Sequence, residues 1–400
     1  MKQQRFDIVI AGGGMVGASL ALALGSYGGR IAVVDQRFAT HVPSSLDVRS
    51  TALNAGSKRF FATLGLWPQV REFAAPIKHI HVSDRGHFGA ARLSADEYEL
   101  EALGYVVENH RVHALLTDSL AGTVNVDTMD ATVTGVQASA EGVTVSAEDL
   151  VLHAGLLVIA AGARGGLSTQ LGMQSHEHSY AQSAIVANVL AARPRAGVAF
   201  ERFTASGPVA LLPLGGARYA VVMTVAAAQE EQLLACPERE FLARLQAVFG
   251  WRLGRFMRVG KRAAFPLSLV QTRRQITQRT VLVGNAARTL HPVAGQGFNL
   301  ALRDVTELAR LLHSEPGVED PGCPALLEEF AARRRADQRS TTATTDLLVK
   351  TFGSTFAPLV VARSAGLVLM DLLPPLRHWF ARRSMGLGAR SPMTELGGTR

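Results

Sequence analysis

Two glycine-rich segments near opposite ends of the chain constrain its fold most strongly. The first, residues 12–17, follows a short apolar run at residues 6–11 and precedes an Ala/Leu-rich stretch with helical character. The second begins at residues 283–286 and continues into residues 291–299. One such turn indicates only a nucleotide-binding unit. Two of them indicate a chain that returns to the same long, two-ended ligand.

The first segment has the strand-to-helix context of a phosphate-binding turn. Gly12 permits the tight turn, Gly14 lets the backbone approach a pyrophosphate, and Gly17 lets helix and strand pack closely. The helix N-terminus offers unpaired N–H groups to the anion. A second apolar run, residues 31–34, ends in Asp35, where an acidic side chain accepts hydrogen bonds from a ribose diol. These residues predict a dinucleotide site, and the second glycine segment favours FAD.

Composition is that of a folded chain with material for two domains. Hydrophobic residues make up 48% of the 400 residues, enough for substantial cores. The net charge is +8, but Lys and Arg are scattered and aromatic residues are only 6%, so nucleic-acid binding is a poor explanation. A basic surface that faces anionic lipid or an acidic partner fits the charge better.

Cysteine and histidine usage argues against a disulfide framework and a metal site. The two cysteines, Cys236 and Cys323, lie far apart in the sequence, and the histidines show no ligand spacing. Met1 leads almost directly into the first predicted strand, which leaves no room for a cleavable signal. We therefore expect a reducing, cytoplasmic setting.

The periodicity between the two glycine segments indicates a second domain. Residues 124–145 alternate as a β-meander, and residues 155–162 form the continuous apolar run of a buried parallel strand. Four further strands and a helix follow, which predicts an antiparallel sheet with one covered face as the substrate platform. Their expected ranges are 184–190, 198–204, 209–214 and 219–225 for the strands and about 229–248 for the helix.

Several longer strings carry a family resemblance. The narrowest are Val-Ser-Asp-Arg-Gly-His at residues 82–87 and Phe-Gly-Trp-Arg-Leu-Gly at residues 249–254. Others lie at residues 47–53, 64–67, 104–109, 199–204, 260–262 and 284–304. Over nearly its whole length the chain resembles the class A flavin-dependent aromatic monooxygenases. Within them it is most similar to the ubiquinone-biosynthesis hydroxylases, and especially to the bacterial 2-polyprenyl-6-methoxyphenol hydroxylases.

The resemblance implies an α/β fold like that of para-hydroxybenzoate hydroxylase. A Rossmann-like FAD-binding domain would carry an inserted antiparallel β-sheet substrate domain, followed by a helical C-terminal segment. The FAD-binding domain would comprise residues 1–72, 109–175 and 271–345, the substrate domain residues 73–108 and 176–270, and the helical tail residues 346–400.

The resemblance also implies the chemistry. In this family reduced flavin and O2 form a C4a-hydroperoxide, which transfers one oxygen to a phenol ring. The implied reaction is hydroxylation of a polyprenylated methoxyphenol in ubiquinone biosynthesis, alongside other proteins of that pathway. A soluble small-phenol hydroxylase and a non-catalytic flavoprotein subunit stay open as alternatives. The ring carbon does not follow, because sister enzymes share every cofactor motif.

By resemblance, the late glycine segment holds the flavin. Gly284 and Asn285 would lie by the ribityl and pyrophosphate region, and Pro292 against the flavin ring. Gly295, Gln296 and Gly297 would direct backbone N–H groups towards N1 and the C2 carbonyl, and Asn299 would begin a helix to residue 311 whose N-terminus stabilises reduced flavin.

Two further cofactor residues follow from the resemblance. Arg49 would contact the flavin or its phosphates, because a guanidinium donates bidentate hydrogen bonds. The backbone of Val133 would meet the adenine. Asn109 stands where many relatives have an arginine, so a phosphate role there does not carry over.

The chain departs from the family pattern where the reductant and the general base are concerned. The usual Asp-Gly pair is Ala161-Gly162, the Gly-Asp pair ends in Asn285, and a common histidine is Arg288. The electron donor, NAD(P)H or a protein reductant, therefore stays undecided. Candidate general bases, none singled out by spacing, are His87, Tyr180, Arg202 and His291.

The sequence of the C-terminal residues 356–383 bears on whether the protein contacts a membrane. Residues 356–373 are apolar, but Arg363 and Asp371 interrupt them and Pro374-Pro375 ends them, so a spanning helix is not expected. Residues 376–383 mix aromatic and arginine side chains. Two interpretations stay open: a segment at a bilayer surface or on a partner, and an amphipathic helix that closes the FAD domain. We expect the Gly-rich end from residue 386 to be disordered.

Overall fold

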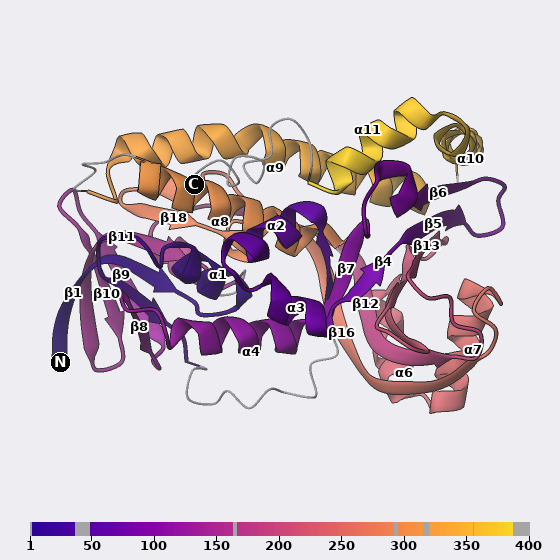
Figure 1. The fold of residues 1–400 in the computed structure, drawn as a ribbon, viewed down its shortest axis with the longest axis horizontal. Helices are drawn as coiled ribbons and strands as arrows, with labels where there is room; N and C mark the ends of the chain where they lie inside the picture. The colour runs from indigo at the N-terminus through magenta and orange to yellow at the C-terminus, as the bar shows by residue number, and fades with distance from the viewer. Residues whose placement is uncertain are drawn as a thin grey trace.

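The structure, a computed structural model, describes residues 2–36, 49–162, 166–291, 295–314, 320–354 and 356–386. Figure 1 shows a parallel-sheet region joined to a second sheet region by the long strands β12 (Ser175–Ala191) and β16 (Phe256–Thr272). The predicted fold class, α/β with an antiparallel sheet region and a helical C-terminal segment, is confirmed. The division into domains at the expected residues stays a prediction.

The first sheet is the dinucleotide-binding frame. Its parallel core has the order β18-β11-β1-β2-β8, with β11 (Leu150–Ile159) beside β1 (Lys2–Ala11) as expected for a buried parallel strand. All four residues of β2 (Ile31–Val34) are buried, which a sheet covered on both faces requires. The remaining strands are β8 (Val126–Met129), β18 (Thr280–Leu282) and β17 (Ile276–Thr277).

The expected meander at residues 124–145 is wrong in its first part. β8 pairs in parallel with β2, and only β9 (Val133–Ala138) and β10 (Val143–Ala147) form an antiparallel ribbon with β11. β8 is the edge strand of the sheet, and only the first of its four residues, Val126, is buried. Alternation of apolar and polar residues indicates which face of a strand is exposed to solvent. It does not indicate which strand pairs with it.

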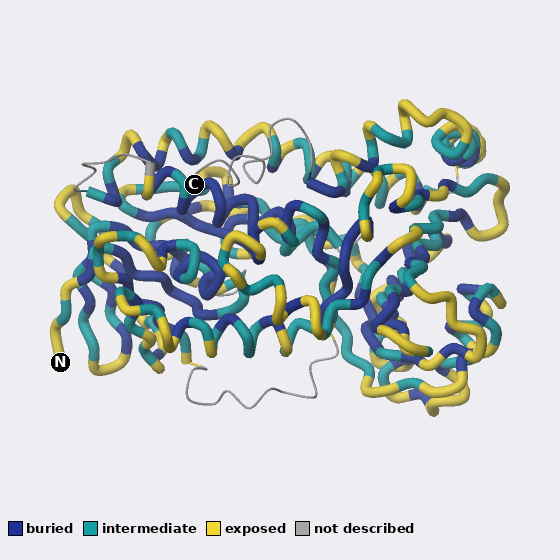
Figure 2. The backbone as a smooth tube through the Cα atoms, viewed as in Figure 1, coloured by how far each residue is buried: buried dark blue, intermediate teal, exposed yellow. Residues whose placement is uncertain are grey.

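Helices cover the sheet and place two N-termini near each other. α1 (Met15–Ala23) packs against α4 (Asn109–Leu120) and α8 (Gln296–Ser314). The buried core between them includes Ile10, Leu20 and Leu302. Figure 2 shows the central strands and the adjoining helix faces as the most deeply buried backbone. This packing brings the start of α8 back to the start of α1.

The second sheet supplies a platform. Its order is β19-β16-β12-β15-β14-β13-β5-β6, antiparallel throughout except for the parallel β13–β5 pair. The four expected strands are confirmed as β12, β13 (Val198–Phe203), β14 (Val209–Pro213) and β15 (Arg218–Ala226). β16, which pairs with β12, carries no continuous apolar run and sequence reasoning missed it. The outer strands are β5 (His79–Asp84), β6 (Ala90–Ser94) and β19 (Arg288–Thr289).

One face of this sheet is covered by two helices, not the single helix expected over residues 229–248. α6 (Glu230–Ala235) and α7 (Glu238–Phe249) are separated at Cys236 and Pro237. Proline has no N–H to continue the first helix and fits the start of the second. The buried side chains of Phe241 and Leu245 pack against the sheet. The opposite face is left for a site.

A small sheet and two helices link these regions. β3 (Ser50–Asn54), β7 (Gly104–Glu108) and β4 (Ala75–Ile77) pair in that order. Beside them lie the helices α2 (Ala55–Thr63) and α3 (Trp67–Phe73).

Three C-terminal helices complete the fold. α9 (Pro324–Gly353) lies along α8, and α10 (Ala357–Leu372) packs on β6 before α11 (Pro374–Ser384) runs back towards α8 (Figure 1). Within the described ranges no single helix has the length and apolarity of a membrane span. α10 and α11 reach that threshold together, with a bend of 96° between them. The Gly-rich end expected to be disordered falls, from residue 387, outside the described residues.

Candidate active site

One cavity of about 1410 Å³ joins the two glycine segments. It lies between the parallel sheet, the open face of the second sheet and the C-terminal helices, and both Gly14 and Gly297 line it. Its volume exceeds the roughly 300–1,000 Å³ of ordinary small-molecule pockets. The space suits a long cofactor together with a substrate.

The glycine turn after β1 has three different steric demands. Gly12 has φ +110°, and a Cβ there would lie 2.7 Å from the backbone of Ala161. A Cβ on Gly17 would lie 1.9 Å from the carbonyl oxygen of Gly12. Gly14 has extended backbone, and its Cβ would meet nothing within 4 Å. Gly12 and Gly17 thus allow close packing, whereas Gly14 keeps the space before the α1 N-terminus open to a ligand.

Asp35 stands at the end of β2 and lines the cavity. Its Oδ2 accepts a hydrogen bond from the N–H of Gly13 at 2.8 Å. This bond holds the acid beside the glycine turn, where a ribose-binding carboxylate is expected.

Arg49, Asn109 and Val133 also line the cavity. The guanidinium of Arg49 lies 5.5 Å from the ring centre of Phe265 on β16. The N–H of Asn109 donates to the carbonyl oxygen of Arg49, which fixes that backbone at the start of β3. Arg49 is thereby placed between the parallel-sheet region and the second sheet.

The second glycine segment meets the cavity at the N-terminus of α8. Asn285, Gly295, Gln296 and Gly297 line it, and Gly295 has φ +59°. Because α8 has 19 residues and opens onto the cavity, its N-terminal N–H groups and dipole favour negative charge there. The N-termini of α1 and α8 therefore open onto the same cavity.

Asn299 lines the cavity, but its side chain is engaged by the protein. Its Nδ2 donates to the carbonyl oxygens of Ala52 and Gly295, both at 2.8 Å. Its Oδ1 accepts from the N–H of Asn54 at 3.0 Å and from the hydroxyl of Ser57 at 2.6 Å. The structure thus gives this side chain a positioning role, because it ties the start of α8 to β3 and α2.

Two predicted cofactor residues, Gly17 and Gly284, do not line the cavity as described. Gly17 lies behind it, and Gly284, with φ +61°, packs where a Cβ would meet Val16 at 3.1 Å. Pro292 lies outside the described residues. For the whole predicted set, contact with FAD itself stays a prediction.

Beyond the cofactor residues the cavity becomes apolar. Ile80, Val82 and Leu212 line it from the second sheet, and Leu348 and Leu367 line it from α9 and α10. At its margin the rings of Phe203 and Phe352 stack with centres 3.6 Å apart. These walls make this section of the cavity suited to a hydrocarbon, and the glycine motifs do not contribute to it.

A buried ion pair anchors the helix that closes the apolar section. Nε of Arg363 on α10 donates to Oδ2 of Asp84 on β5 at 2.8 Å, and both side chains are almost fully buried. Its Nη1 donates to the carbonyl oxygens of Thr351, Phe352 and Ser354. Asp84 belongs to the narrow string at residues 82–87, so that string holds α10 over the cavity.

One acid lies in the apolar section, and sequence reasoning missed it. Glu201 on β13 lines the cavity, and burial raises its pKa to about 7. The sequence does contain a signal for it, because Glu201 is a single acid between the apolar residues Ala199 and Phe203 at alternate positions of one strand. None of the four candidate general bases named from the sequence lines this cavity as described: His87, Tyr180, Arg202 and His291.

The family follows from this geometry and from comparison with known proteins. Residues 5–345 match the FAD binding domain family. The chain belongs to this family. It is an FAD-dependent monooxygenase, and the predicted resemblance and cofactor are confirmed.

Relatives of known name match this chain along almost its whole length. It is 35% identical to ubiquinone hydroxylase UbiL of Rhodospirillum rubrum, over 96% of this chain and 91% of the relative. It is 28% identical to 3-demethoxyubiquinol 3-hydroxylase of Escherichia coli, over 97% of this chain and 100% of the relative. The fold resembles p-nitrophenol 4-monooxygenase PnpA of Pseudomonas putida, with TM-score 0.78, 17% identity, and coverage of 97% and 100% of the two chains.

Proposed function

We propose that this chain hydroxylates the ring of a polyprenylated phenol in ubiquinone biosynthesis, using FAD and O2. The observation that carries the proposal is a single cavity that continues from the cofactor residues into an apolar section. The names of the Rhodospirillum rubrum and Escherichia coli relatives, both of which denote hydroxylases of the ubiquinone series, support it.

The apolar section matches a prenyl tail in chemistry. Its walls are aliphatic and aromatic side chains from the second sheet, α9 and α10. Burying hydrocarbon contributes about 0.8 kcal/mol per CH2, so even a partly enclosed tail would orient the phenol at the head of the cavity. A small phenol would leave most of this section unused.

Bound FAD supplies the electrons and the oxygen transfer, and the chain's own residues do the rest. The N-terminus of α1 would hold the negative charge of the pyrophosphate and that of α8 the negative charge of reduced flavin, with Asp35 beside the glycine turn. Asn299 holds the start of α8 in place. The apolar walls exclude water from the reacting ring.

Gly366 on α10 offers a graded test of the prenyl site. It lines the cavity, and a Cβ there would meet nothing within 4 Å. Replacement by Ala should meet no clash, and Leu and Phe should fill the apolar section in further steps. We expect kcat/KM for a geranylated methoxyphenol to fall by about tenfold or more for Gly366→Phe, because about 1.4 kcal/mol of lost tail binding is tenfold. Turnover of 2-methoxyphenol, which has no tail, should change little.

The matched control is Ala362→Leu on the exposed face of the same helix. It adds similar bulk outside the cavity and should leave both substrates unaffected. Equal loss for the tailed and tailless phenols in the Gly366 series would instead favour a small-phenol hydroxylase. Bound flavin that no donor reduces would favour the non-catalytic alternative.

We further propose that α10 and α11 place the enzyme at a membrane surface in the cytoplasm. Leu372 and Trp379 are 68% and 62% exposed, and Arg382 and Arg383 are exposed beside them. Apolar side chains beside arginines suit an interface with anionic lipid. Flotation with anionic vesicles should decrease for Leu372→Glu with Trp379→Glu, whereas Trp251→Glu, at a 71% exposed site on the second sheet region, should have no effect. Undiminished flotation of the double variant would remove these helices from the interface.

A further inference from the structure

We propose that Glu201 is the catalytic base that accepts the phenolic proton of the substrate, an assignment that rests on the proposed function. The side chain comes from the middle of β13, on the face of the second sheet that lines the cavity.

The placement follows from strand alternation. Ala199, Glu201 and Phe203 are alternate residues of β13, and all three line the cavity. The register places Val82 of β5 and Ala210 of β14 on either side of Glu201, and both also line the cavity. Among the described residues that this sheet contributes to the wall, Glu201 is the one charged side chain.

The carboxylate has no protein partner among the described residues. Asp84 of β5, the nearest acid along the neighbouring strand, is paired with Arg363 of α10. Arg92 of β6 is paired with Asp371 of α10, and on α9 Lys350 is paired with Asp346. The other titratable residues of β5 are His79 and His81, and β14 has none. No cation among the described residues compensates Glu201, and its partial burial raises its pKa to about 7.

An unpartnered carboxylate in an apolar cavity costs free energy, so it calls for a ligand that completes it. A phenol has an O–H donor on an otherwise apolar ring, which matches one carboxylate in an apolar wall. A base also works best when its pKa lies close to the working pH, and about 7 meets that condition.

The proton transfer balances with the established oxidation. The phenol O–H proton moves to a carboxylate oxygen of Glu201 while the freed electron pair on the phenol oxygen is donated into the ring. A C–O bond forms at the ring carbon with the oxygen atom supplied by O2 through the FAD-dependent activity. That carbon then loses its hydrogen as a proton, the ring becomes aromatic again, and Glu201 returns its proton to the phenol oxygen. The second oxygen atom of O2 takes up the proton from the ring carbon and leaves as water, with the two electrons and the remaining proton supplied by the reductant of the FAD-dependent activity.

Ligand binding to the oxidised holoenzyme tests the assignment without turnover. The probes are 2-methoxyphenol and its O-methyl ether, followed by the change in flavin absorbance. We expect affinity for the phenol to rise severalfold as pH increases through about 7, because the ionised carboxylate accepts a stronger hydrogen bond. The ether, which has no O–H, should show no such rise. Neither probe should show it with Glu201→Gln.

Steady-state kinetics supply the second readout. Glu201→Gln should lower kcat by about 10²–10⁴, the usual contribution of a general base, with a much smaller change in KM. The acid limb of the kcat/KM profile near pH 7 should disappear, and Glu201→Asp should restore it in part. Wild-type rates in Glu201→Gln, or an unchanged acid limb, would overturn the assignment. A pH-dependent affinity for the ether equal to that for the phenol would do so too.

Folding and substrate class can be separated from the assignment. Because the folded state holds the Glu201 pKa above its ordinary value, this group makes the protein less stable as pH rises from about 4.5 to 7. Glu201→Gln should therefore be at least as stable as wild type above pH 7, measured by thermal unfolding. Since 2-methoxyphenol has no tail, failure of the prenyl proposal in the Gly366 series would leave this test intact.

Discussion

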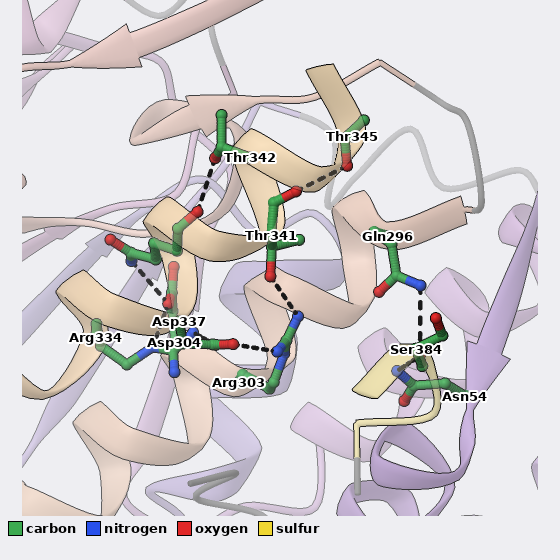
Figure 3. Close-up of polar contacts among 11 residues, drawn as sticks. Asn54, Gln296, Arg303, Asp304, Arg334, Asp337, Thr341, Thr342, Thr345 and Ser384 are labelled. Carbon is green, nitrogen blue, oxygen red and sulfur yellow. Dashed lines mark hydrogen bonds and ion pairs between the residues drawn. The ribbon is translucent and has the colours of Figure 1, made fainter. Parts of the chain in front are cut away.

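Arg334 on α9 donates from Nε to Oδ1 of Asp304 on α8 at 2.6 Å, and both side chains are almost completely buried (Figure 3). Nη2 of Arg334 also donates to Asp337, and Gln338 donates to the same Oδ1 of Asp304. The network holds the long C-terminal helix against the helix whose N-terminus opens on the cofactor cavity. The position of α9, and with it one wall of the apolar section, depends on this pair.

We expect Arg334→Met to lower the free energy of unfolding by about 3–5 kcal/mol, because it leaves a buried carboxylate uncompensated. Combining it with Asp304→Leu should cost less than the sum of the two single changes, because the orphaned charge is removed. Denaturant unfolding of the FAD-loaded protein measures both. Arg335→Met, at an exposed position of α9, should stay within about 0.5 kcal/mol of wild type.

Gly14 and Gly17 should respond in opposite ways to the same small change. Gly17→Ala puts a methyl group 1.9 Å from the carbonyl oxygen of Gly12, so we expect loss of stability and of flavin together. Gly14→Ala meets nothing within 4 Å, so the apoprotein should fold normally. Its methyl group would occupy the approach to the pyrophosphate, and FAD affinity should fall by about tenfold or more.

Thermal unfolding of the apoprotein and fluorescence titration with FAD separate these two effects. Gly28→Ala, at an exposed site where a Cβ meets nothing within 4 Å, is the matched control and should change neither quantity. Normal FAD affinity in Gly14→Ala would contradict the proposed approach of the pyrophosphate.

Asn299→Leu should loosen the start of α8 from β3. It removes two donated and two accepted hydrogen bonds and leaves the buried N–H of Asn54 without its acceptor. We expect a loss of about 2–4 kcal/mol of unfolding free energy, because each unsatisfied buried polar group costs about 1–3 kcal/mol. If the side chain acts by position, Asn299→Asp should also lose stability, because it keeps the accepting oxygen but replaces the two donated hydrogen bonds with contacts between oxygens. Loss of bound FAD in Asn299→Leu without any loss of stability would instead indicate that the Asn299 side chain contacts FAD directly.

His291 should make the protein sensitive to acid. It is 1% exposed, its ring meets Tyr180 edge-on at 5.3 Å, and burial lowers its pKa to about 4. The unfolded chain binds a proton near pH 6.5 that the folded state does not, so stability falls as pH drops from 6.5 towards 4. Between pH 7 and 5 the stability of His291→Gln relative to wild type should improve by about 2 kcal/mol, measured by denaturant unfolding. A constant difference across that range would show that His291 does not titrate in this way.

Local pattern was sufficient for much of the cofactor half of the molecule. The strand, turn, helix and acid at residues 6–35 are all close in the chain, and their geometry follows from backbone rules that need no partner. The apolar run at residues 155–162 likewise predicted a buried parallel strand, which is β11 beside β1. The narrow strings at residues 82–87 and 249–254 identified the family before any contact was known.

Pairings and environments required the folded chain. β8 alternates like a strand of a meander but joins the parallel sheet, because exposure at an edge and partner identity are independent. Asn299 reads as a cofactor ligand in the motif, yet four protein groups from β3, α2 and its own loop take its side chain.

Glu201 shows most clearly which properties of the site the sequence does not determine by itself. Its position on β13 is visible in the alternation of apolar residues around it. In the described part of the chain its carboxylate has no cation beside it, and burial raises its pKa to about 7. Both properties depend on β5, β14, α9 and α10, which come from distant parts of the sequence. Periodicity and turn chemistry are properties of neighbouring residues and can be read along the chain. Burial, charge compensation and the shape of the cavity are sums over residues that only folding brings together.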